Sequence, residues 1–578
     1  MKQERPVYVA DFEATTKVED CRVWAWGVMK VGDINDWFYG HEMVEFMEWL
    51  RGCNADIYFH NLKYDGSFII NWLMHNGFTP TQEDKVQKGE FSALISKMGQ
   101  WYQIEVNFGY VGKKKSVVKI FDSLKKLPFK VAQIAKGFGL ETLKGDIDYH
   151  KERPVGYRMD EEEIDYLYND LAIVSQALDH QFKEGLTKMT NGSDALQGFK
   201  DILGMKRYDK YFPVYDEELN KNIRLAYRGG FTWVNPKFQG KVVEGGKVFD
   251  VNSMYPAMMM DKPLPVGSPI PFKGKYEQDD LYPLYIQHVR CYFDIKKDKI
   301  PCIQIKKHLY FKGNDYLKTS GTHYVDLHVT NVDLQLILDH YDLDDVEFVG
   351  GFKFQAMTGI FKDYIEKWME IKSDPESTKA MVLLAKLMLN SLYGKFATNT
   401  DVTGKVPYLK PNGALGFEKG IDKTRDPIYT PMGCFITAYA RENTIRTAQK
   451  MYHRFIYADT DSIHVSGLEE ADAIADVIHP TRLGWWDHEA SFKRAIYLRQ
   501  KTYFIETTWK EVDGKMKVCD PKEATKVKDK IACAGMNDKI KEKIKFEDFR
   551  IGFKSDGSIK PKQVFGGVVL VDYPFEIK

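Results

Sequence analysis

Two aspartates separated by one residue constrain what this chain can fold into. Asp459 and Asp461 lie within an apolar, strand-like run over residues 455–465. Side chains at i and i+2 of one strand leave the same face, so we expect these carboxylates to share divalent ions, which prefer oxygen ligands. Asp250 follows an apolar pair far upstream and is the candidate third ligand.

Three carboxylates that hold two magnesium ions can stabilise both the attacking and the leaving oxygen of an in-line displacement at phosphorus. The spacing alone leaves alternatives open, because an Asp-x-Asp pair also occurs in nucleotide-sugar transferases and in ordinary turns.

A second group of acids lies near the other end of the chain. Asp11 and Glu13 are two apart at the end of a strand pattern over 7–10. Asn61 and Asp65 are four apart where a helical pattern begins, and can share one face. Tyr166 and Asp170 have the same spacing in a helical pattern over 161–178. The pattern is indicated by the apolar positions Ile164, Leu167, Leu171 and Val174.

The four acids of this group are Asp11, Glu13, Asp65 and Asp170. They can hold two metals, with Tyr166 orienting a water for phosphodiester hydrolysis. The alternative for any single acid is a solvated helix end or an edge strand.

The residues, in this order, resemble the motifs of the protein-primed family B DNA polymerases of small terminal-protein bacteriophages, over nearly the whole chain. Asp11 to Glu13, His60 to Asp65, and Tyr166 with Asp170 are similar to three proofreading-exonuclease motifs. Four stretches resemble polymerisation motifs: 250–256, 386–394, 457–462 and 501–503.

The resemblance implies an α/β and α+β multidomain chain, in which a ribonuclease-H-like 3′-5′ exonuclease domain precedes a right-hand polymerase of palm, fingers and thumb. Two terminal-protein-region insertions interrupt the polymerase. The expected parts are exonuclease 1–192, palm 193–261, first insertion 262–360, fingers 361–397, second insertion 398–427, palm 428–533 and thumb 534–578.

Local patterns predict two elements of these parts. Residues 361–396 read as two antiparallel helices, broken at Ser373-Asp374-Pro375. Residues 398–425 read as a hairpin, since Pro411-Asn412-Gly413 supplies turn chemistry. A hairpin that reaches across DNA would enclose it and part the strands ahead.

The helix over 386–394 is expected to face a triphosphate. Lys386, Asn390 and Tyr393 fall at i, i+4 and i+7, on one face, although a core helix with one snorkelling lysine is the alternative. The resemblance implies that Tyr255 lies under the sugar and excludes a ribose 2′-hydroxyl. The implied nucleotide ligands are Val251, Ser253, Tyr255, Lys386, Asn390 and Tyr393.

The resemblance also implies that Lys144 acts beside the exonuclease metals and that several residues contact DNA. These DNA ligands are Tyr58, His60, Asn61, Phe68, Ser123, Leu124, Tyr227, Gly229, Gly230, Lys501 and Tyr503. Core packing is the default alternative for Tyr58 and Phe68. Lys501 and Tyr503 are expected to alternate on one strand face, where a solvated edge strand is the alternative.

The implied metal ligands are Asp11, Glu13, Asp65, Asp170, Asp250, Val251, Asp459 and Asp461. They imply two Mg²⁺ ions per active site, with Mn²⁺ able to substitute. Ala14 departs from the pattern, because the family usually has threonine there; one hydroxyl contact to the edited strand is thereby in doubt.

Composition limits the location and the partners of the chain. The formal net charge is zero, so a nucleic-acid binder must concentrate its basic groups locally. Seven cysteines without a Cys-x-x-Cys pair indicate reduced thiols and no zinc site. No apolar stretch approaches membrane-spanning length. We expect a monomer, apart from its terminal-protein complex, in the cytoplasm of an infected bacterium.

The sequence therefore predicts a replicative DNA polymerase that edits its product and links a first nucleotide to a terminal-protein hydroxyl. Its substrates would be template-primer DNA and deoxynucleoside triphosphates. Priming rests on the resemblance alone. Two rivals stay open: a dedicated nuclease whose polymerase half only grips DNA, and a non-catalytic replication scaffold.

Overall fold

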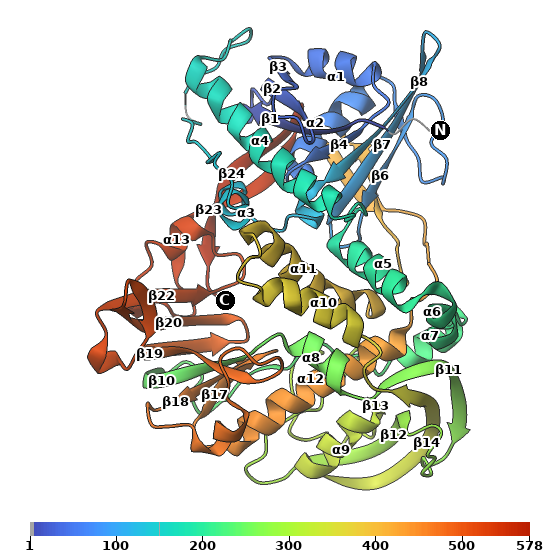
Figure 1. Ribbon diagram of the computed structural model, residues 1–578, viewed down its shortest axis with the longest axis vertical. Coiled ribbons are helices and arrows are strands. Elements are labelled where there is room, and N and C mark those ends of the chain that lie inside the picture. Colours follow the sequence, from blue (N-terminus) through green and yellow to red (C-terminus); the bar gives the residue numbers. More distant parts are fainter. Residues whose placement is uncertain (1–4, 150) are drawn as a thin grey trace.

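The computed structural model describes residues 5–149 and 151–578, and its N-terminal part is built on a mixed eight-stranded sheet (Figure 1). The order is β3-β2-β1-β4-β8-β7-β6-β5, with β1 parallel to β4 and β4 parallel to β8. The strands are β1 (Val7–Ala14), β2 (Val23–Lys30), β3 (Trp37–Gly40), β4 (Asp56–Phe59), β5 (Thr79–Pro80), β6 (Glu90–Ile95), β7 (Trp101–Val111) and β8 (Lys114–Asp122).

Helices cover this sheet and carry its functional candidates. They are α1 (Met43–Arg51), α2 (Leu62–His75), α3 (Val131–Phe138) and α4 (Glu161–Lys183). The helical pattern predicted for 161–178 is thus part of a longer helix. Asp160 begins α4 by accepting the Glu163 N–H at 3.0 Å, as expected of an N-cap. Helix α4 then packs against β1 and β2.

A second, antiparallel sheet forms the lower left of Figure 1, in the order β21-β20-β19-β10-β18-β17-β9, with β22 beside β20. Its strands are β9 (Thr232–Val234), β10 (Val242–Val251), β17 (Phe455–Asp459), β18 (Ser462–Ser466), β19 (Trp486–Arg499), β20 (Thr502–Val512), β21 (Lys515–Val518) and β22 (Lys526–Ala532). Helices α8 (Met254–Asp261) and α12 (Thr430–Lys450) pack together beside it.

The prediction of one strand over 455–465 is wrong. The run is a hairpin: β17 ends at Asp459, β18 begins at Ser462, and Thr460 between them has a φ of 63°. The N–H of Asp461 donates to the carbonyl of Asp459 at 2.8 Å, which closes the turn. Sequence periodicity missed the turn because both arms are apolar and no glycine or proline marks it.

The prediction that Lys501 lies on a strand is likewise wrong. It lies in the turn between β19 and β20, with a φ of 55°, and not on a strand face shared with Tyr503. Lys501 is exposed, whereas Tyr503 is buried.

The region from 262 to 360 forms its own four-stranded sheet, in the order β11-β14-β12-β13. Its elements are β11 (Leu264–Lys273), β12 (Leu284–Ile295), β13 (Val325–Thr330), α9 (Asn331–His340) and β14 (Tyr341–Met357). Figure 1 shows this sheet at the lower right, on the far side of α12 from β10.

The two helices predicted over 361–396 are present and packed together, as α10 (Lys362–Ser373) and α11 (Lys379–Phe396). The helices α5 (Asn191–Leu203), α6 (Met205–Tyr211) and α7 (Glu217–Arg224) precede β9, and α5 packs against α11. The predicted hairpin is also present: β15 (Lys405–Leu409) pairs with β16 (Leu415–Lys419) around Gly413, whose φ is 76°.

The C-terminal segment returns to the N-terminal sheet. After α13 (Asp538–Lys541), the strands β23 (Lys554–Val564) and β24 (Gly567–Glu576) form a hairpin that packs on α2. At its tip, the ring of Phe565 lies 5.1 Å from that of His75. A Cβ on Gly413 would meet Phe565 at 2.6 Å, so the two hairpins touch there.

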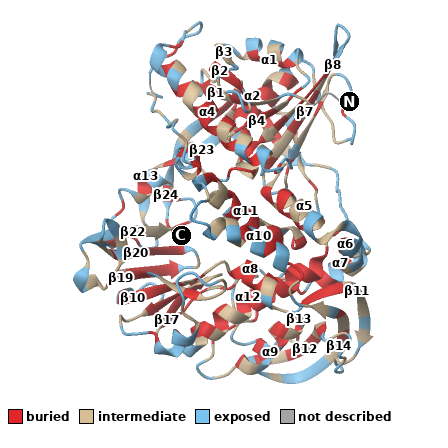
Figure 2. Cartoon of the chain, viewed as in Figure 1, coloured by how far each residue is buried: buried red, intermediate tan, exposed pale blue. Residues whose placement is uncertain are grey.

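One large apolar cluster joins these parts. It runs from Leu171 of α4 through Phe199 of α5 and Leu392 of α11 to Met432 of α12. Figure 2 shows the corresponding buried helices in the middle of the molecule. Within the described ranges, no helix combines the length and apolar character needed to span a bilayer.

A buried ion pair fixes the junction between the N-terminal sheet and α5. The Nζ of Lys126 lies 2.6 Å from Oδ2 of Asp194, and both side chains are fully buried. Burial lowers the pKa of Lys126, while the Asp194 charge opposes that shift. Replacing one member leaves the other charge buried without compensation.

We therefore predict that Asp194→Ala lowers the free energy of unfolding by about 3–5 kcal/mol. Glu217→Ala, which breaks the exposed Lys221–Glu217 pair of α7, should change it by less than about 1 kcal/mol. Chemical denaturation followed by tryptophan fluorescence measures both. Equal midpoints for the two variants would show that the buried pair contributes no more than a surface pair.

Candidate catalytic sites

The first site lies where β1, α2 and α4 meet. Strand β1 supplies Asp11 and Glu13 from within the strand, the first turn of α2 supplies Asp65, and α4 supplies Tyr166 and Asp170. All five line a cavity of about 720 Å³. The structure thus brings together four acids that the sequence separates by up to 160 positions.

These acids have strongly perturbed protonation. Burial, and next the charge of Asp170, raise the pKa of Asp11 to about 7. Burial and the Asp11 charge raise the pKa values of Glu13 and Asp65 well above the usual range. Crowded, buried carboxylates of this kind call for cations.

Two carboxylate oxygens support the fit to metal ions. Oδ1 of Asp65 and Oδ1 of Asp170 are buried and have no hydrogen-bond partner among the described residues. Buried polar atoms are rarely left unsatisfied in a folded protein. These oxygens are the hard ligands that Mg²⁺ accepts.

A lysine and two tyrosines complete this site. The Nζ of Lys144 donates to the Tyr166 hydroxyl at 2.9 Å and also pairs with Oδ2 of Asp170. The hydroxyls of Tyr149 and Tyr166 lie 2.7 Å apart. Tyr149 escaped the sequence analysis because it lies in a turn, where no periodicity marks it.

The residues expected to hold a single strand fall into two groups. His60 and Asn61 line the cavity. Nδ1 of His60 lies 2.9 Å from the Ser123 hydroxyl and Nε2 lies 2.8 Å from the carbonyl of Phe129, while burial lowers its pKa. Asn61 is exposed, with a φ of 73°.

The second group is not in the cavity wall. Tyr58 is buried and stacks on Phe121, Phe68 is buried against Gly567, and Ser123 is fully buried. Leu124 is half-buried. Core packing therefore describes Tyr58 and Phe68 in this structure, and their contact with DNA stays a prediction.

The C-terminal part adds a wall that the sequence did not indicate. Lys539, Ile559, Leu570 and Asp572 line the same cavity as the four acids. No local signal marks them, because the packing of the β23–β24 hairpin on α2, and of α13 on β23, brings them to the site.

The second site lies at one end of the antiparallel sheet. Asp250 of β10 stands opposite Ser462 of β18, next to Asp461. The N–H of Val251 donates to the carbonyl of Asp461 at 2.8 Å, and Asp459 ends the neighbouring strand. Asp250, Asp459 and Asp461 are therefore gathered, although the turn, rather than one strand face, brings the last two together.

Burial, and next the charge of Asp461, raise the pKa of Asp250 to about 7. Burial also raises the pKa of Asp461, with Asp459 adding to the shift. The Nζ of Lys501 lies 2.6 Å from Oδ1 of Asp459. Each acidic set thus contains one lysine. In the described ranges, no three His, Cys, Asp or Glu side chains lie close enough together to hold a metal ion.

Helix α11 lies beside this second site and presents the expected face. Lys386 and Asn390 are exposed, while Met388 and Leu392 are buried on the opposite side. The ring of Tyr393 stacks on that of Tyr255, with centroids 3.8 Å apart and planes at 17°.

Ser253 precedes α8 with a φ of 53°. Its hydroxyl accepts from the Nζ of Lys372 at 3.2 Å. Lys372, near the end of α10, is a cation that the sequence analysis missed.

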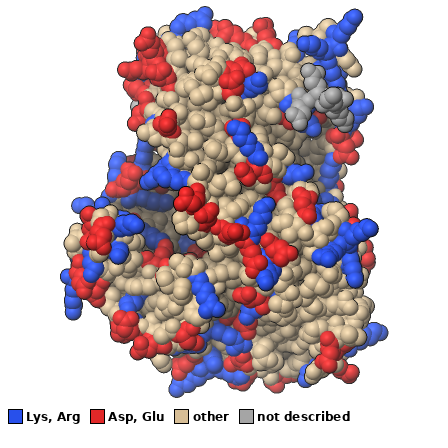
Figure 3. All heavy atoms as spheres, viewed as in Figure 1, with Lys and Arg blue, Asp and Glu red and all other residues tan. Residues whose placement is uncertain are grey.

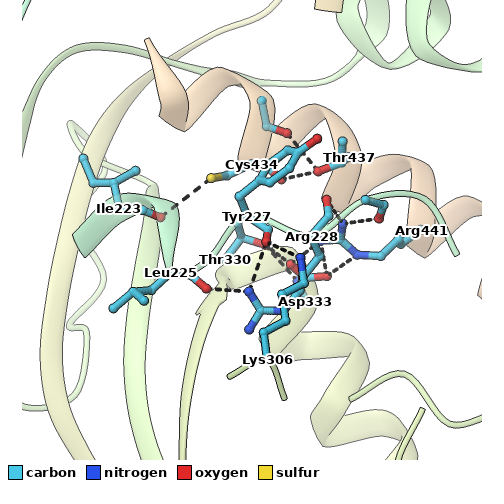
Figure 4. Close-up of polar contacts among 12 residues, drawn as sticks. Ile223, Leu225, Tyr227, Arg228, Lys306, Thr330, Asp333, Cys434, Thr437 and Arg441 are labelled. Carbon is cyan, nitrogen blue, oxygen red and sulfur yellow. Dashed lines mark hydrogen bonds and ion pairs between the residues drawn. The ribbon is translucent and has the colours of Figure 1, made fainter. Parts of the chain in front are cut away.

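The segment 227–230 is held against the second site by a buried arginine (Figure 4). Arg441 of α12 donates to the carbonyls of Arg228 and Gly229, both at 2.8 Å, and its Nη2 bonds both oxygens of Asp333. Figure 4 shows Tyr227 beside this group.

Gly230 allows the chain to lie close to the turn between β17 and β18. A Cβ there would lie 2.6 Å from the hydroxyl of Thr460. One turn further along α12 from Arg441, Thr444 donates to the Thr460 carbonyl at 2.6 Å. Neither Arg441 nor Thr444 was identified from sequence, since they act on residues more than ten positions away.

Tyr503 lies beneath the turn. Its ring centroid is 5.3 Å from that of Tyr457, whose hydroxyl donates to Oδ2 of Asp459 at 3.2 Å. In this structure Tyr503 therefore packs against the side chain that bonds Asp459.

Comparison with known proteins gives a consistent result. The model for "DNA polymerase type B, organellar and viral" matches residues 50–480. The chain is 56% identical to the DNA polymerases of Bacillus phages M2 and phi29, covering 99% of this chain and 100% and 99% of theirs.

Two solved structures of phi29 DNA polymerase match over the full length of both chains. One is its complex with primer-template DNA, with 55% identity and a TM-score of 0.95. The other, with a TM-score of 0.94, also holds incoming nucleotide substrates. The family model matches about three quarters of this chain, and the relatives and solved structures match nearly all of it. This chain therefore belongs to the type B DNA polymerases of organelles and viruses.

Proposed function

We propose that this DNA polymerase initiates on a terminal protein, extends the new strand with strand displacement, and edits it by 3′-5′ hydrolysis. The observation that carries the proposal is the presence of two separate acidic sites in one chain. Asp250, Asp459 and Asp461 would serve synthesis, and the set around Asp11 would serve editing.

In the synthetic site, two Mg²⁺ ions would supply Lewis-acid chemistry for displacement at phosphorus. Asp250, Asp459, Asp461 and the Val251 carbonyl would hold them. Lys386 and Lys372 place positive charge where phosphate oxygens would lie, and Ser253 would contact the same oxygens. The stacked Tyr255 and Tyr393 would separate to admit the base pair and the sugar.

In the editing site, the four acids would hold the ions and Tyr166 would orient the attacking water. Lys144 fixes the Tyr166 hydroxyl and lends positive charge. The large cavity gives room for the end of a single strand, with His60 and Asn61 in its wall.

Protein priming is supported by the architecture. Residues 264–357 contribute a separate four-stranded sheet, on which a terminal protein would dock. Attack by a protein hydroxyl needs the same acids as attack by a primer 3′-hydroxyl, so one site serves both.

The division into parts stays as predicted from sequence. Exonuclease, palm, fingers, thumb and insertions would follow the ranges given above. DNA and nucleotides as partners are supported by the solved phi29 DNA polymerase complexes, which hold primer-template DNA and incoming nucleotides. Figure 3 shows lysines and arginines around a hollow beside the C-terminal strands, a suitable wall for DNA. A phage origin would place the protein in the host cytoplasm.

Asp459→Asn should abolish both initiation on a terminal protein and primer extension, by more than about a hundredfold, because it removes a metal ligand. Degradation of single-stranded DNA should persist. Labelled nucleotide incorporation measures the first two activities. Asp476→Asn, an exposed acid beyond β18, is the control; loss of extension with normal initiation would contradict the shared site.

Asp11→Ala combined with Asp65→Ala should remove DNA degradation and keep synthesis. Two of the four editing acids are lost, while the second site is untouched. A labelled oligonucleotide degraded with magnesium gives the readout, and Asp179→Ala on the far end of α4 is the control. Unchanged hydrolysis in the double variant would refute the editing assignment.

Deleting residues 400–426 should shorten the products and prevent copying through duplex DNA. The ends of this segment are adjacent, since the N–H of Arg425 donates to the carbonyl of Thr400 at 3.0 Å, so the chain can close. Product length on primed circular DNA is the measurement, with Glu418→Gln as the control. Full-length products from the deletion variant would exclude a role for the hairpin in enclosing DNA.

A further inference from the structure

A second, smaller cavity adjoins the editing cavity. Its volume is about 250 Å³, and the two share Thr15, Thr16 and Tyr149 in their walls. Residues of the C-terminal hairpin line the large cavity, whereas the small one is lined by residues of the N-terminal part. The small cavity therefore lies on the side of Thr15, Thr16 and Tyr149 away from the C-terminal wall.

The two cavities differ in charge. Acids outnumber bases in the wall of the large cavity. In the small cavity the relation is reversed, with bases Lys17, Lys151 and Arg153 against acids Asp20 and Glu152. An anion released among the carboxylates is therefore repelled less in the small cavity than in the large one.

Lys17 is the cation best able to take up such an anion. Arg153 is committed, because its Nη2 lies 2.9 Å from Glu163 and its guanidinium covers the ring of Trp24. Lys151 is committed as well, because its Nζ lies 3.2 Å from Glu163 and also pairs with Asp160. Lys17 pairs with Glu152 at 3.2 Å, and these side chains are 59% and 84% exposed. An exposed pair of this kind is weak, so its ammonium can exchange Glu152 for a phosphate.

Hydrogen bonds hold the wall that the two cavities share. The Thr15 hydroxyl accepts from the Arg22 N–H at 3.0 Å. The Tyr149 hydroxyl is bonded to Tyr166. Thr16 between them is exposed.

We propose that the small cavity is the release site for the deoxynucleoside 5′-monophosphate that editing produces. This inference rests on the proposed editing function. Hydrolysis breaks the bond between phosphorus and the 3′-oxygen of the preceding nucleotide; water gives its hydroxyl to phosphorus and its proton to that oxygen. The product is one nucleotide, and its phosphate is an anion that the Lys17 ammonium can pair with.

The test is inhibition of editing by added deoxyadenosine monophosphate. Lys17→Glu should raise the concentration that halves steady-state degradation of single-stranded DNA by about threefold, the size of one exposed charge pair. Glu152→Lys should lower that concentration by about the same factor. The rate of the first cleavage, measured with enzyme in excess, should stay at the wild-type value in both variants.

Lys183→Glu, an exposed lysine at the end of α4, is the matched control and should leave the inhibition unchanged. An equal shift in Lys17→Glu and Lys183→Glu, or no shift in either charge variant, would overturn the release site. Absence of any degradation by the unaltered enzyme would instead overturn the editing function.

Discussion

Repulsion among buried carboxylates is the constraint on which this structure depends. Each candidate site gathers acids that raise one another's pKa, and the pKa values of Asp11 and Asp250 are both raised to about 7. Such groups stay together only if the surrounding fold is rigid and a positive charge is at hand. The two sheets supply the rigidity, and Lys144 and Lys501 supply the charge.

The rigidity comes from side chains that act at a distance in sequence. Helix α12 holds the segment 227–230 through Arg441, and it holds the turn between β17 and β18 through Thr444. The two residues are one turn apart on the helix. Gly230 then lies directly against Thr460. The apolar cluster from α4 to α12 joins this arrangement to the helix that carries Tyr166 and Asp170 in the first site.

Patterns with a local cause were predicted well from the sequence. Helical spacing located α4, α10 and α11, and the Pro-Asn-Gly turn located the β15–β16 hairpin. The family and the fold class followed from ordered motifs and are confirmed by the comparisons. The order of the acids also indicated which of them would meet.

Errors arose where local rules were overridden. Thr460 and Lys501 take positive φ without being glycine, so two predicted strand runs contain turns. Tyr149, Lys372, Arg441 and the C-terminal wall of the editing cavity were missed, because tertiary packing alone brings them into place. Tyr58 and Phe68 fit either a core or a stacking surface by composition, and the structure buries both.

The ammonium group of Lys501 has a consequence for ion selectivity. Tethered 2.6 Å from Asp459, it acts as a resident monovalent counter-ion. A sodium or potassium ion that replaced it would bring the same charge and gain little Coulomb energy, whereas a divalent ion doubles the charge. By charge alone, replacing this ammonium group with a divalent ion is therefore more favourable than replacing it with sodium or potassium.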